Sequence, residues 1–347
     1  MKSSIKNIIK GVGVLSVIGL VMTSCHNQNF EFDDYDYSAA YFSYQYPVRT
    51  LVLGEDILDN SLDNEHKLEI YATMGGVYNN DKKVTLDITV DETLCDGLFV
   101  DEAKTEALNP MPTAYYELLS DKIILDKRMQ GGVQVQLKDA FFDDPKSIKN
   151  SYAIPVLITS AHNVDSVLVG SKNPAVTSPV RTTPTDWDVL PKDYVLYVVK
   201  YINPYDAIYL RRGKDVITEA GVQSDTTRRK EYVESDDIIT LTTAAKNVVT
   251  MPLTINYGAK LTADCELDLT FDNNGNCTVA SATPNFTVTG TGKFVSKGEK
   301  DSWGNKDRSA IYLDYNVKYN GQVEYATLDT LVVRNRNVKM EILTPYK

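Results

Sequence analysis

The sequence predicts an all-β chain in which an N-terminal β-sandwich is followed by a C-terminal antiparallel β-barrel. Three observations support this fold class. Short segments of alternating or β-branched apolar residues recur along the chain, bounded by Gly, Asn, Asp or Pro. A proline-rich stretch separates these segments into two groups. No segment has the 3.6-residue period and the caps of a long helix, and only the stretch around Asp101 to Leu108 favours a helical turn or two.

Residues 1–24 indicate a lipoprotein signal peptide. Lys2, Lys6 and Lys10 form a positive head, and an apolar run follows. This run of about a dozen residues is too short to cross a bilayer as a helix, which takes about 20. Small residues precede Cys25, so the pattern resembles the lipobox of bacterial lipoproteins, in which the cysteine carries the lipid. An ordinary signal peptide that ends at a chance cysteine is the alternative.

Residues 25–37 form an acidic tether behind this anchor. Glu31, Asp33, Asp34 and Asp36 lie within a dozen residues of Cys25. The segment resembles the acidic export tag of surface-exposed lipoproteins in Bacteroidetes. We therefore expect a lipid-anchored protein of the outer membrane that faces the outside of the cell. A solvated tether without an export role is the alternative.

Composition excludes several classes of partner and site. The chain has 36 basic and 47 acidic residues, and the signal peptide carries three of the basic ones. A surface this acidic is a poor partner for nucleic acid and for anionic lipid. Cys95, Cys265 and Cys277 remain after lipidation, without the close spacing of a zinc site, so we expect free thiols and no metal centre. The length suggests two domains.

The first domain, residues 38–170, is predicted to be the β-sandwich. In the segment VTLDITV the apolar side chains share one face of a strand, because side chains alternate along a strand. The segment VQVQL has the same alternation. One buried face per strand is typical of two sheets packed face to face. The residues expected in this core include Val84, Leu86, Ile88, Val90, Val133, Val135 and Leu137.

Residues 171–193 are predicted to be a linker, because proline at this density fits neither a helix nor a central strand. Residues 194–347 are predicted to be the barrel. About eight sequential strands follow one another there, and Asn274-Gly275 and Asn320-Gly321 are strong signals for type I′ hairpin turns. An up-and-down, lipocalin-like barrel would remove the exposed sheet edges. A second sandwich is the alternative.

Segments in both halves resemble a known family. The first half contains AAYFSYQYPVRTLVLGED, DNSLDNEHKLEIYATMGGVYNN and YAIPVLITSA, and the second contains YDAIYLRRG, GTGKFV and TLVVRNR. These are similar to two-domain surface lipoproteins encoded in Bacteroidetes polysaccharide utilization loci, beside transporters of the starch-utilization type. The resemblance implies an immunoglobulin-like first domain, a calycin-like second domain, glycan capture, and a transporter complex in the outer membrane as partner. It implies no particular sugar and no catalytic residues.

The residues themselves offer little for catalysis. With His26, His66 and His162 as the only histidines, a catalytic triad or a multi-histidine metal site has almost nothing to be built from. Nucleophile-elbow, phosphate-loop and dinucleotide motifs are missing, so we expect no cofactor and no enzyme. A pair of carboxylates would be enough for a glycosidase, and the many acidic residues keep that alternative open.

Sugar binding uses aromatic faces and hydrogen-bonding side chains. Trp303 lies in a polar, Gly-rich loop, either as a stacking platform or folded over the end of the barrel. Arg211 and Arg334 fall on predicted strands, where they are structural if carboxylates pair with them and mark a ligand if they are unpaired. With Tyr312 these are the candidate glycan-binding residues. Trp187, in the proline-rich stretch, is predicted to pin the two domains together.

Three functions remain at this point. The first is a surface protein that binds a polysaccharide or oligosaccharide without catalysis, anchored to the membrane by its lipid. The second is a structural or adhesive module without a small ligand. The third is a glycoside hydrolase with an unrecognised carboxylate pair, at least one of which would have a raised pKa.

Overall fold

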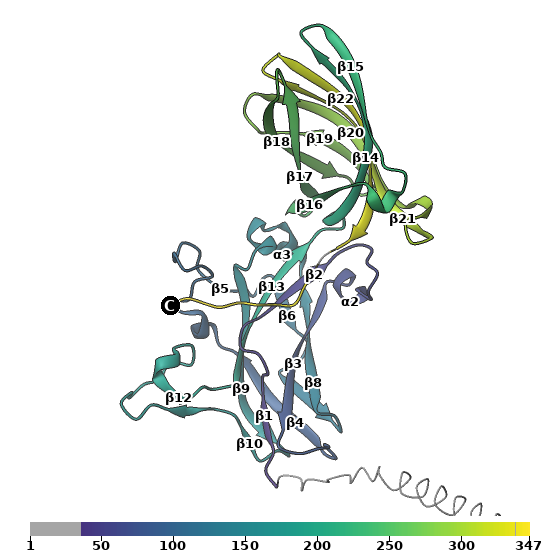
Figure 1. Cartoon of the computed structure of the whole chain (residues 1–347). Coiled ribbons are helices and arrows are strands. Elements are labelled where there is room, and N and C mark those ends of the chain that lie inside the picture. Colours follow the sequence, from purple (N-terminus) through teal and green to yellow (C-terminus); the bar gives the residue numbers. More distant parts are fainter. Residues whose placement is uncertain (1–35, 337) are drawn as a thin grey trace, which may run out of the picture.

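The computed structural model describes residues 36–336 and 338–347, so the predicted signal peptide, Cys25 and most of the acidic tether lie outside the described residues. A sandwich of two sheets carries a barrel on one of its ends (Figure 1). The predicted all-β fold class is confirmed, including the barrel.

The first sheet of the sandwich has five strands. Its central strands alternate between buried and solvent-facing side chains, and the predicted core residues Val133, Val135 and Leu137 are buried. Apolar side chains on one face therefore fix which side of this sheet meets the other. In spatial order the strands are β10 (Ser166–Val167), β1 (Ala39–Tyr41), β3 (Lys67–Gly75), β8 (Gln130–Leu137) and β6 (Tyr116–Leu118).

The second sheet packs against the first across one apolar core. Val84, Leu86 and Ile88 are buried in this core as predicted, and Val90 is half-buried. In spatial order the strands are β23 (Glu341–Ile342), β2 (Pro47–Val52), β13 (Tyr194–Ile202), β9 (Tyr152–His162), β4 (Lys83–Val90) and β7 (Lys122–Asp126), and the short β5 (Asn109–Pro110) also pairs with β9.

The domain boundary predicted at residue 194 differs from the one in the structure. β13 belongs to the sandwich, where it pairs in parallel with β2 and antiparallel with β9. Six of its nine side chains are buried, because it is covered on both faces as a central strand. The barrel begins at Ala207 and ends at Asn335, and the chain then returns to the sandwich as β23.

Residues 171–193 consequently connect two neighbouring strands of one sheet and do not link the domains. Trp187 does not pin the domains together, because its indole Nε1 donates to the carbonyl of Val180 within the same segment, at 2.9 Å. The carboxylate of Asp193 holds Arg181 at 2.9 Å and ties the segment to the start of β13. The segment contains a small hairpin of β11 (Ser171–Lys172) and β12 (Trp187–Val189).

Helical structure is confined to short turns in the described residues. Residues 101–108 form no helix but one hydrogen-bonded turn, from the Lys104 N–H to the Asp101 carbonyl at 3.1 Å. The carboxylate of Asp101 then accepts the backbone N–H groups of Thr105 and Glu106 and closes a loop. None of the described helices has the length and apolar character needed to span a bilayer. The helices are α2 (Ser61–Asn64) and α3 (Asp139–Asp143), with 3₁₀ turns at Glu92–Cys95, Pro145–Ile148, Pro184–Asp186 and Val233–Ser235.

The barrel closes because its first strand pairs with its last. Alternate side chains point inward and form an apolar core that includes Tyr209, Met251, Leu267 and Ile311. Around the barrel the strands are β14 (Ala207–Glu219), β16 (Asp237–Ala245), β17 (Val248–Tyr257), β18 (Leu261–Phe271), β19 (Asn276–Ala280), β20 (Phe286–Ser302), β21 (Lys306–Tyr319) and β22 (Val323–Asn335), with β15 (Val222–Arg228) beside the outer half of β14.

The barrel wall has an opening beside β15. β14 pairs with β22 along one edge. Along its other edge, Ala207–Arg211 pair with β16, and the residues from Gly213 to Glu219 pair with β15. β16 pairs with β17 over a few residues only, up to Thr242 opposite Thr250. Within the part of the chain that the structure describes, no ladder joins β15 to β17. The residues of β17 that follow Thr250 therefore have a free edge on this side.

The two predicted hairpin turns have different outcomes. Asn320 and Gly321 both have positive φ angles, 49° and 66°, as a type I′ turn requires, so this turn is confirmed. The turn predicted at Asn274-Gly275 is wrong in type, since only Gly275 of the two has a positive φ. It is also wrong in register, because a two-residue turn would pair Cys277 with Asp272, whereas Cys277 pairs with Phe271. The carboxylate of Asp272 accepts the N–H of Asn274 and holds a wider loop.

The first chain crossing between the domains is built on a buried amide. The Asn203 side chain donates to the carbonyls of Ala245 and Val248 at 3.0 and 2.9 Å, so the end of β13 is tied to the barrel. The neighbouring Asp206 accepts the backbone N–H and the hydroxyl of Thr243. Burial raises the pKa of the Asp206 carboxyl above its usual value, against the lowering effect of these hydrogen bonds.

The second crossing is built on a buried guanidinium. Arg336 follows the last barrel strand and donates to the carbonyls of Leu53, Glu55 and Asn203, at 2.9, 3.1 and 2.6 Å. One side chain from the barrel end therefore clamps a loop of the sandwich and the first crossing at the same time. Buried carbonyl groups need such donors, since an unpaired one is costly.

Candidate functional site

A pocket of about 200 Å³ lies at the opening in the barrel wall. We call it the barrel pocket. The free edge of β17 forms one rim, and the inward side chains of β14, β15 and β22 form the other walls. Ile217, Leu253 and Ile255 supply apolar surface, and the polar side chains in its wall include Arg211, Asp215, Thr226, Arg228, Tyr325 and Thr327.

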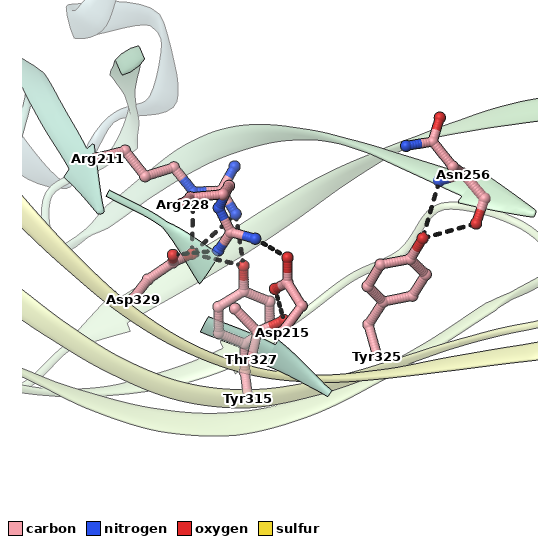
Figure 2. A network of polar contacts seen from close by, with 8 residues as sticks. All are labelled: Arg211, Asp215, Arg228, Asn256, Tyr315, Tyr325, Thr327 and Asp329. Carbon is pink, nitrogen blue, oxygen red and sulfur yellow. Dashed lines mark hydrogen bonds and ion pairs between the residues drawn. The ribbon is translucent and has the colours of Figure 1, made fainter. Parts of the chain in front are cut away.

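The floor of the barrel pocket is a network of ion pairs centred on Asp329 (Figure 2). The Asp329 carboxylate is completely buried and receives Arg211 Nη2 at 2.8 Å, Arg228 Nη2 at 2.6 Å and the hydroxyl of Tyr315 at 2.8 Å. Arg211 Nη2 also donates to the Tyr315 hydroxyl oxygen at 3.1 Å. Side chains from β14, β15 and β21 thus meet the carboxylate of Asp329 on β22.

A second carboxylate extends the network toward the rim. Asp215 pairs with the other terminal nitrogen of Arg228 and accepts the hydroxyl of Thr327 at 2.8 Å (Figure 2). The network therefore holds two guanidinium and two carboxylate groups, and it is electrically balanced. Balanced and hydrogen-bonded charges are what a barrel interior tolerates.

The pKa values of the network reflect its burial. Burial lowers the pKa of the Arg211 guanidinium, but the adjacent Tyr315 and Asp329 outweigh that effect and leave the pKa above its usual value. The pKa of Tyr315 is raised, chiefly by burial and then by the charge of Asp329. Both shifts keep the network in one protonation state at neutral pH, with Arg211 charged and Tyr315 neutral.

Gly213 makes the network sterically possible. A Cβ atom at this position would lie 2.3 Å from an oxygen of Asp329 and 2.3 Å from the carbonyl oxygen of Leu328. The glycine thus lets β14 approach β22 closely enough for Asp329 to reach Arg228.

We therefore expect Gly213→Ala to destabilise the barrel by about 1–3 kcal/mol, because the backbone carbonyl cannot move away from the new methyl group. Urea unfolding measures this loss. Gly221→Ala is a poor control, since Gly221 has a positive φ. Ala substitution of the exposed Lys214 is the suitable one, and an equal loss in both variants would contradict the steric argument.

Tyr325 crosses the barrel to the free edge of β17. Its hydroxyl donates to the carbonyl of Asn256 at 2.7 Å and accepts the backbone N–H of Asn256 at 3.2 Å (Figure 2). A neighbouring strand would satisfy these groups in a complete wall, and here a side chain from the opposite wall does so. The free edge is thus stabilised without closing the opening.

The side chains of the barrel pocket are chemically suited to a small ligand that has many hydroxyl groups. Guanidinium, hydroxyl and carboxylate groups offer donors and acceptors that are already fixed by the network, and the three apolar side chains can cover C–H groups. Acid–base catalysis is not suggested by the arrangement, because each carboxylate in the network is held by guanidinium groups and would have to break an ion pair to exchange a proton.

The predicted glycan-binding residues do not form one site. Only Arg211 lies in the barrel pocket, where Asp329 pairs with it. Tyr312 faces outward and donates to Glu299 at 2.7 Å, and burial together with this bond raises the pKa of Tyr312 to about 12. Arg334 is exposed on the outside of β22.

Trp303 lies in the turn between β20 and β21, at the barrel end next to the sandwich. Its indole Nε1 donates to the carbonyl of Val333 at 3.1 Å, and the guanidinium of Arg308 covers its ring at 3.5 Å. One face of the indole is therefore occupied by a cation, and the ring is not an open platform on that side.

Sequence reasoning missed Asp215, Arg228, Tyr315 and Asp329 as parts of a site. One signal was present for Asp329: it occupies an inward position of β22 between two others, Thr327 and Leu331, that are also buried. A buried acid in such a row needs a partner.

Two family models match the chain. A model for a domain of unknown function, DUF5627, matches residues 204–337, which include the whole barrel. A model described as an N-terminal domain matches residues 34–165, which include most of the sandwich. A search of curated proteins finds no match.

Two solved structures are similar to the chain. The first is a Bacteroides ovatus protein of unknown function, solved at 2.40 Å, with 44% sequence identity and a TM-score of 0.84; the match covers 90% of this chain and 99% of that one. The second is a candidate carbohydrate-binding protein of Bacteroides ovatus ATCC 8483, solved at 1.50 Å, with 10% identity and a TM-score of 0.27, over 89% of this chain and 99% of that one. Similarity at this second level supports no conclusion about fold or function.

Proposed function

The chain belongs to the two-domain family that includes the 44% identical Bacteroides ovatus protein, and we propose that it is a non-catalytic binding protein whose barrel pocket recognises one sugar unit of a glycan. The barrel pocket is the observation that carries this proposal. Its volume of about 200 Å³ lies below the roughly 300–1,000 Å³ of pockets for drug-sized ligands. A pocket of this size suits a single small ring or the end of a chain.

The chemistry of the wall supports a sugar. Thr226 is exposed at the rim, Asp215 and Thr327 lie between it and the floor, and Arg228 belongs to the floor network, so hydroxyl groups on one ring can find both donors and acceptors. Because the network already fixes Arg228, Asp215 and Thr327, little entropy of these side chains is lost when a ligand binds. Ile217 and Leu253 supply the apolar surface that a pyranose ring needs on its C–H side.

The setting of this binding activity follows from the sequence. Lipidation of Cys25 would hold the protein on the outer membrane, and the acidic tether would favour its outer face. There it would serve a polysaccharide utilization system as an accessory of a starch-utilization-type transporter complex. Metabolic labelling with an azido fatty acid tests the anchor: the wild-type chain is expected to carry label, and Cys25→Ala to carry none.

The charge balance of the network favours a second candidate function. Four charged groups that pair with one another need no ligand, so the barrel is also compatible with a structural or adhesive module. The two functions predict different results when the barrel pocket is blocked, because only a binding protein would then lose affinity for a glycan.

Blocking the barrel pocket tests the proposal. Thr226 is exposed and lies opposite Asp215 on the inner side of β15, so Thr226→Trp fills the pocket without disturbing the core. We expect the chain from residue 26 onward to be retarded by at least one polysaccharide in affinity electrophoresis. The variant is expected to lose at least about tenfold in affinity, which is about 1.4 kcal/mol.

Thr227→Trp is the matched control. Thr227 is the next residue of the same strand, is equally exposed and points to the other face, so it places the same aromatic group outside the pocket. Its affinity is expected to equal that of the wild type. Retardation by a glycan that both variants retain would exclude the barrel pocket as the site, and no retardation by any glycan would favour the structural module.

A further inference from the structure

A second pocket lies where the barrel meets the sandwich. It has a volume of about 140 Å³, and we call it the junction pocket. Residues of the sandwich loop at 55–57 form one side, and β20, β21 and β22 of the barrel form the other. Figure 1 shows the turn between β20 and β21 reaching past the barrel end toward the sandwich. The barrel pocket opens through a different part of the wall, beside β15.

Positive charge gathers in the junction pocket, although the chain as a whole is acidic. Its walls contain Lys297, Arg308, Arg334 and Arg336. Within residues 36–336 and 338–347, none of these four forms an ion pair. The network in the barrel pocket is different, since its guanidinium groups are paired with carboxylates. Unpaired guanidinium groups in a pocket are a mark of an anionic ligand.

Three carboxylates also line the junction pocket, but none of them forms a direct ion pair with these four cations. Glu55 accepts the hydroxyls of Ser296 and Ser309, at 2.5 and 2.9 Å. Asp307 pairs with Lys300, which does not line the pocket, at 2.8 Å. Asp56 accepts a backbone N–H from the next residue. The four cations thus outnumber the three carboxylates, and each carboxylate makes its described hydrogen bonds or ion pair with other groups.

Arg336 has a donor left over. It is 7% exposed, its terminal nitrogens donate to backbone carbonyls, and no described acceptor lies within hydrogen-bond distance of its Nε–H. The Oδ1 atom of the adjacent Asn335, which also lines the pocket, has no partner among the described residues either. Buried polar atoms without partners are rare in folded proteins, and a ligand is one way to satisfy them.

Arg308 is held ready for an anion. Its guanidinium stacks on the Trp303 ring at 3.5 Å, and its Nε donates to the Trp303 carbonyl oxygen at 3.1 Å. Its terminal nitrogens keep their free donors. An arginine that is fixed by an aromatic ring loses little entropy when it binds a planar carboxylate.

We propose that the junction pocket binds the carboxylate of an acidic sugar, a uronic acid unit, through Arg334 and Arg308 with the unpaired donor of Arg336 behind them. Ile57 and Phe294 provide apolar surface for the C–H face of the ring. A carboxylate matches the planar fork of arginine better than a hydroxyl does. The inference takes the ligand class, a glycan, from the proposed function, but it concerns a different site.

Trp303 provides the readout. The chain contains two tryptophans, and Trp187 lies in the segment between β9 and β13, so in a Trp187→Phe background the fluorescence reports on Trp303 alone. D-galacturonate is expected to change this fluorescence with saturation, because a carboxylate on Arg308 alters the cation that covers the indole. D-galactose and sodium acetate at equal concentration and ionic strength are expected to leave it unchanged.

Arg334→Gln is expected to weaken the binding of D-galacturonate at least tenfold. Arg334 is exposed and outside every described ion pair and hydrogen bond, so this substitution is not expected to alter folding, and thermal unfolding checks that. Arg229→Gln is the matched control, because Arg229 is also exposed and unpaired among the described residues but does not line the pocket. It removes the same charge and is expected to leave binding unchanged.

Three results would overturn the inference: no saturable response to D-galacturonate, an equal response to D-galactose or acetate, or equal affinities in Arg334→Gln and Arg229→Gln. The proposals for the barrel pocket and the junction pocket can be refuted independently. Thr226→Trp is expected to leave the affinity for D-galacturonate intact, measured by isothermal titration calorimetry because the new tryptophan also fluoresces, whereas Arg334→Gln is expected to leave the retardation by a neutral glycan intact.

Discussion

Asp329→Asn is expected to lower the free energy of unfolding of the barrel by about 3–5 kcal/mol. The substitution keeps the size of the side chain and removes its charge. Arg211 then loses its only described carboxylate partner, while Arg228 keeps Asp215, and both guanidinium groups are largely buried. Removing one partner of a buried ion pair costs this much because the other charge stays in a poorly solvating environment.

The measurement is urea unfolding, followed by the fluorescence of Trp303 in a Trp187→Phe background, so that the signal reports on the barrel. Asp225→Asn is the control. Asp225 pairs with Lys214 on the outside of the neighbouring strands, and both side chains are more than half exposed. Its loss is expected to cost less than about 1 kcal/mol. A similar small cost for Asp329→Asn would mean that the network contributes little to the stability of the barrel.

Arg336→Ala is expected to lower the free energy of unfolding by about 3 kcal/mol. It is also expected to make the two domains unfold in separate transitions. Without the guanidinium, the buried carbonyl of Leu53 loses its donor, and the carbonyl of Asn203 keeps only the 3.3 Å bond from the Asp206 backbone N–H. An unsatisfied buried acceptor costs about 1–3 kcal/mol. The same side chain joins the sandwich loop to the chain crossing, so its removal weakens the coupling between the domains.

Differential scanning calorimetry tests this expectation. The wild type is expected to unfold in one calorimetric transition, because domains unfold together while their interface holds. Arg336→Ala is expected to unfold in two resolved transitions. Small-angle scattering is expected to show a wider distribution of domain orientations in the variant. Arg334→Ala, two residues earlier and exposed, is the control. Identical melting profiles for both variants would exclude Arg336 as the residue that couples the domains.

Much of the fold could be predicted from the sequence because local patterns determine it. Alternation along residues 83–90 predicted which side chains enter the core, and Val84 and Leu86 are fully buried. The place of β13 could not be predicted in the same way. Its apolar run indicates a strand covered on both faces, but nothing within one strand says which sheet covers it.

The candidate site was less predictable because its contacts are distant in sequence. Arg211 and Asp329 are 118 residues apart, and their pairing depends on the closure of the barrel between β14 and β22. The sequence argument correctly made the role of each arginine depend on its pairing. Arg211 has a carboxylate partner and Arg334 has none among the described residues, and this difference appears only once the strands are placed.

The return of the chain to the sandwich after the barrel has a mechanical consequence. The barrel is inserted between β13 and β23, so once the direct contacts between the domains have broken, two strands of one sheet carry the force that pulls the domains apart. β23 is joined to β2 by two residue pairs only and is expected to peel away at low load. β13 is held between β2 and β9 and is expected to resist until the sheet itself ruptures. If the N-terminal end is fixed and the barrel is pulled, the connection between the domains is thus expected to break in two stages, with β23 detaching first and β13 afterwards.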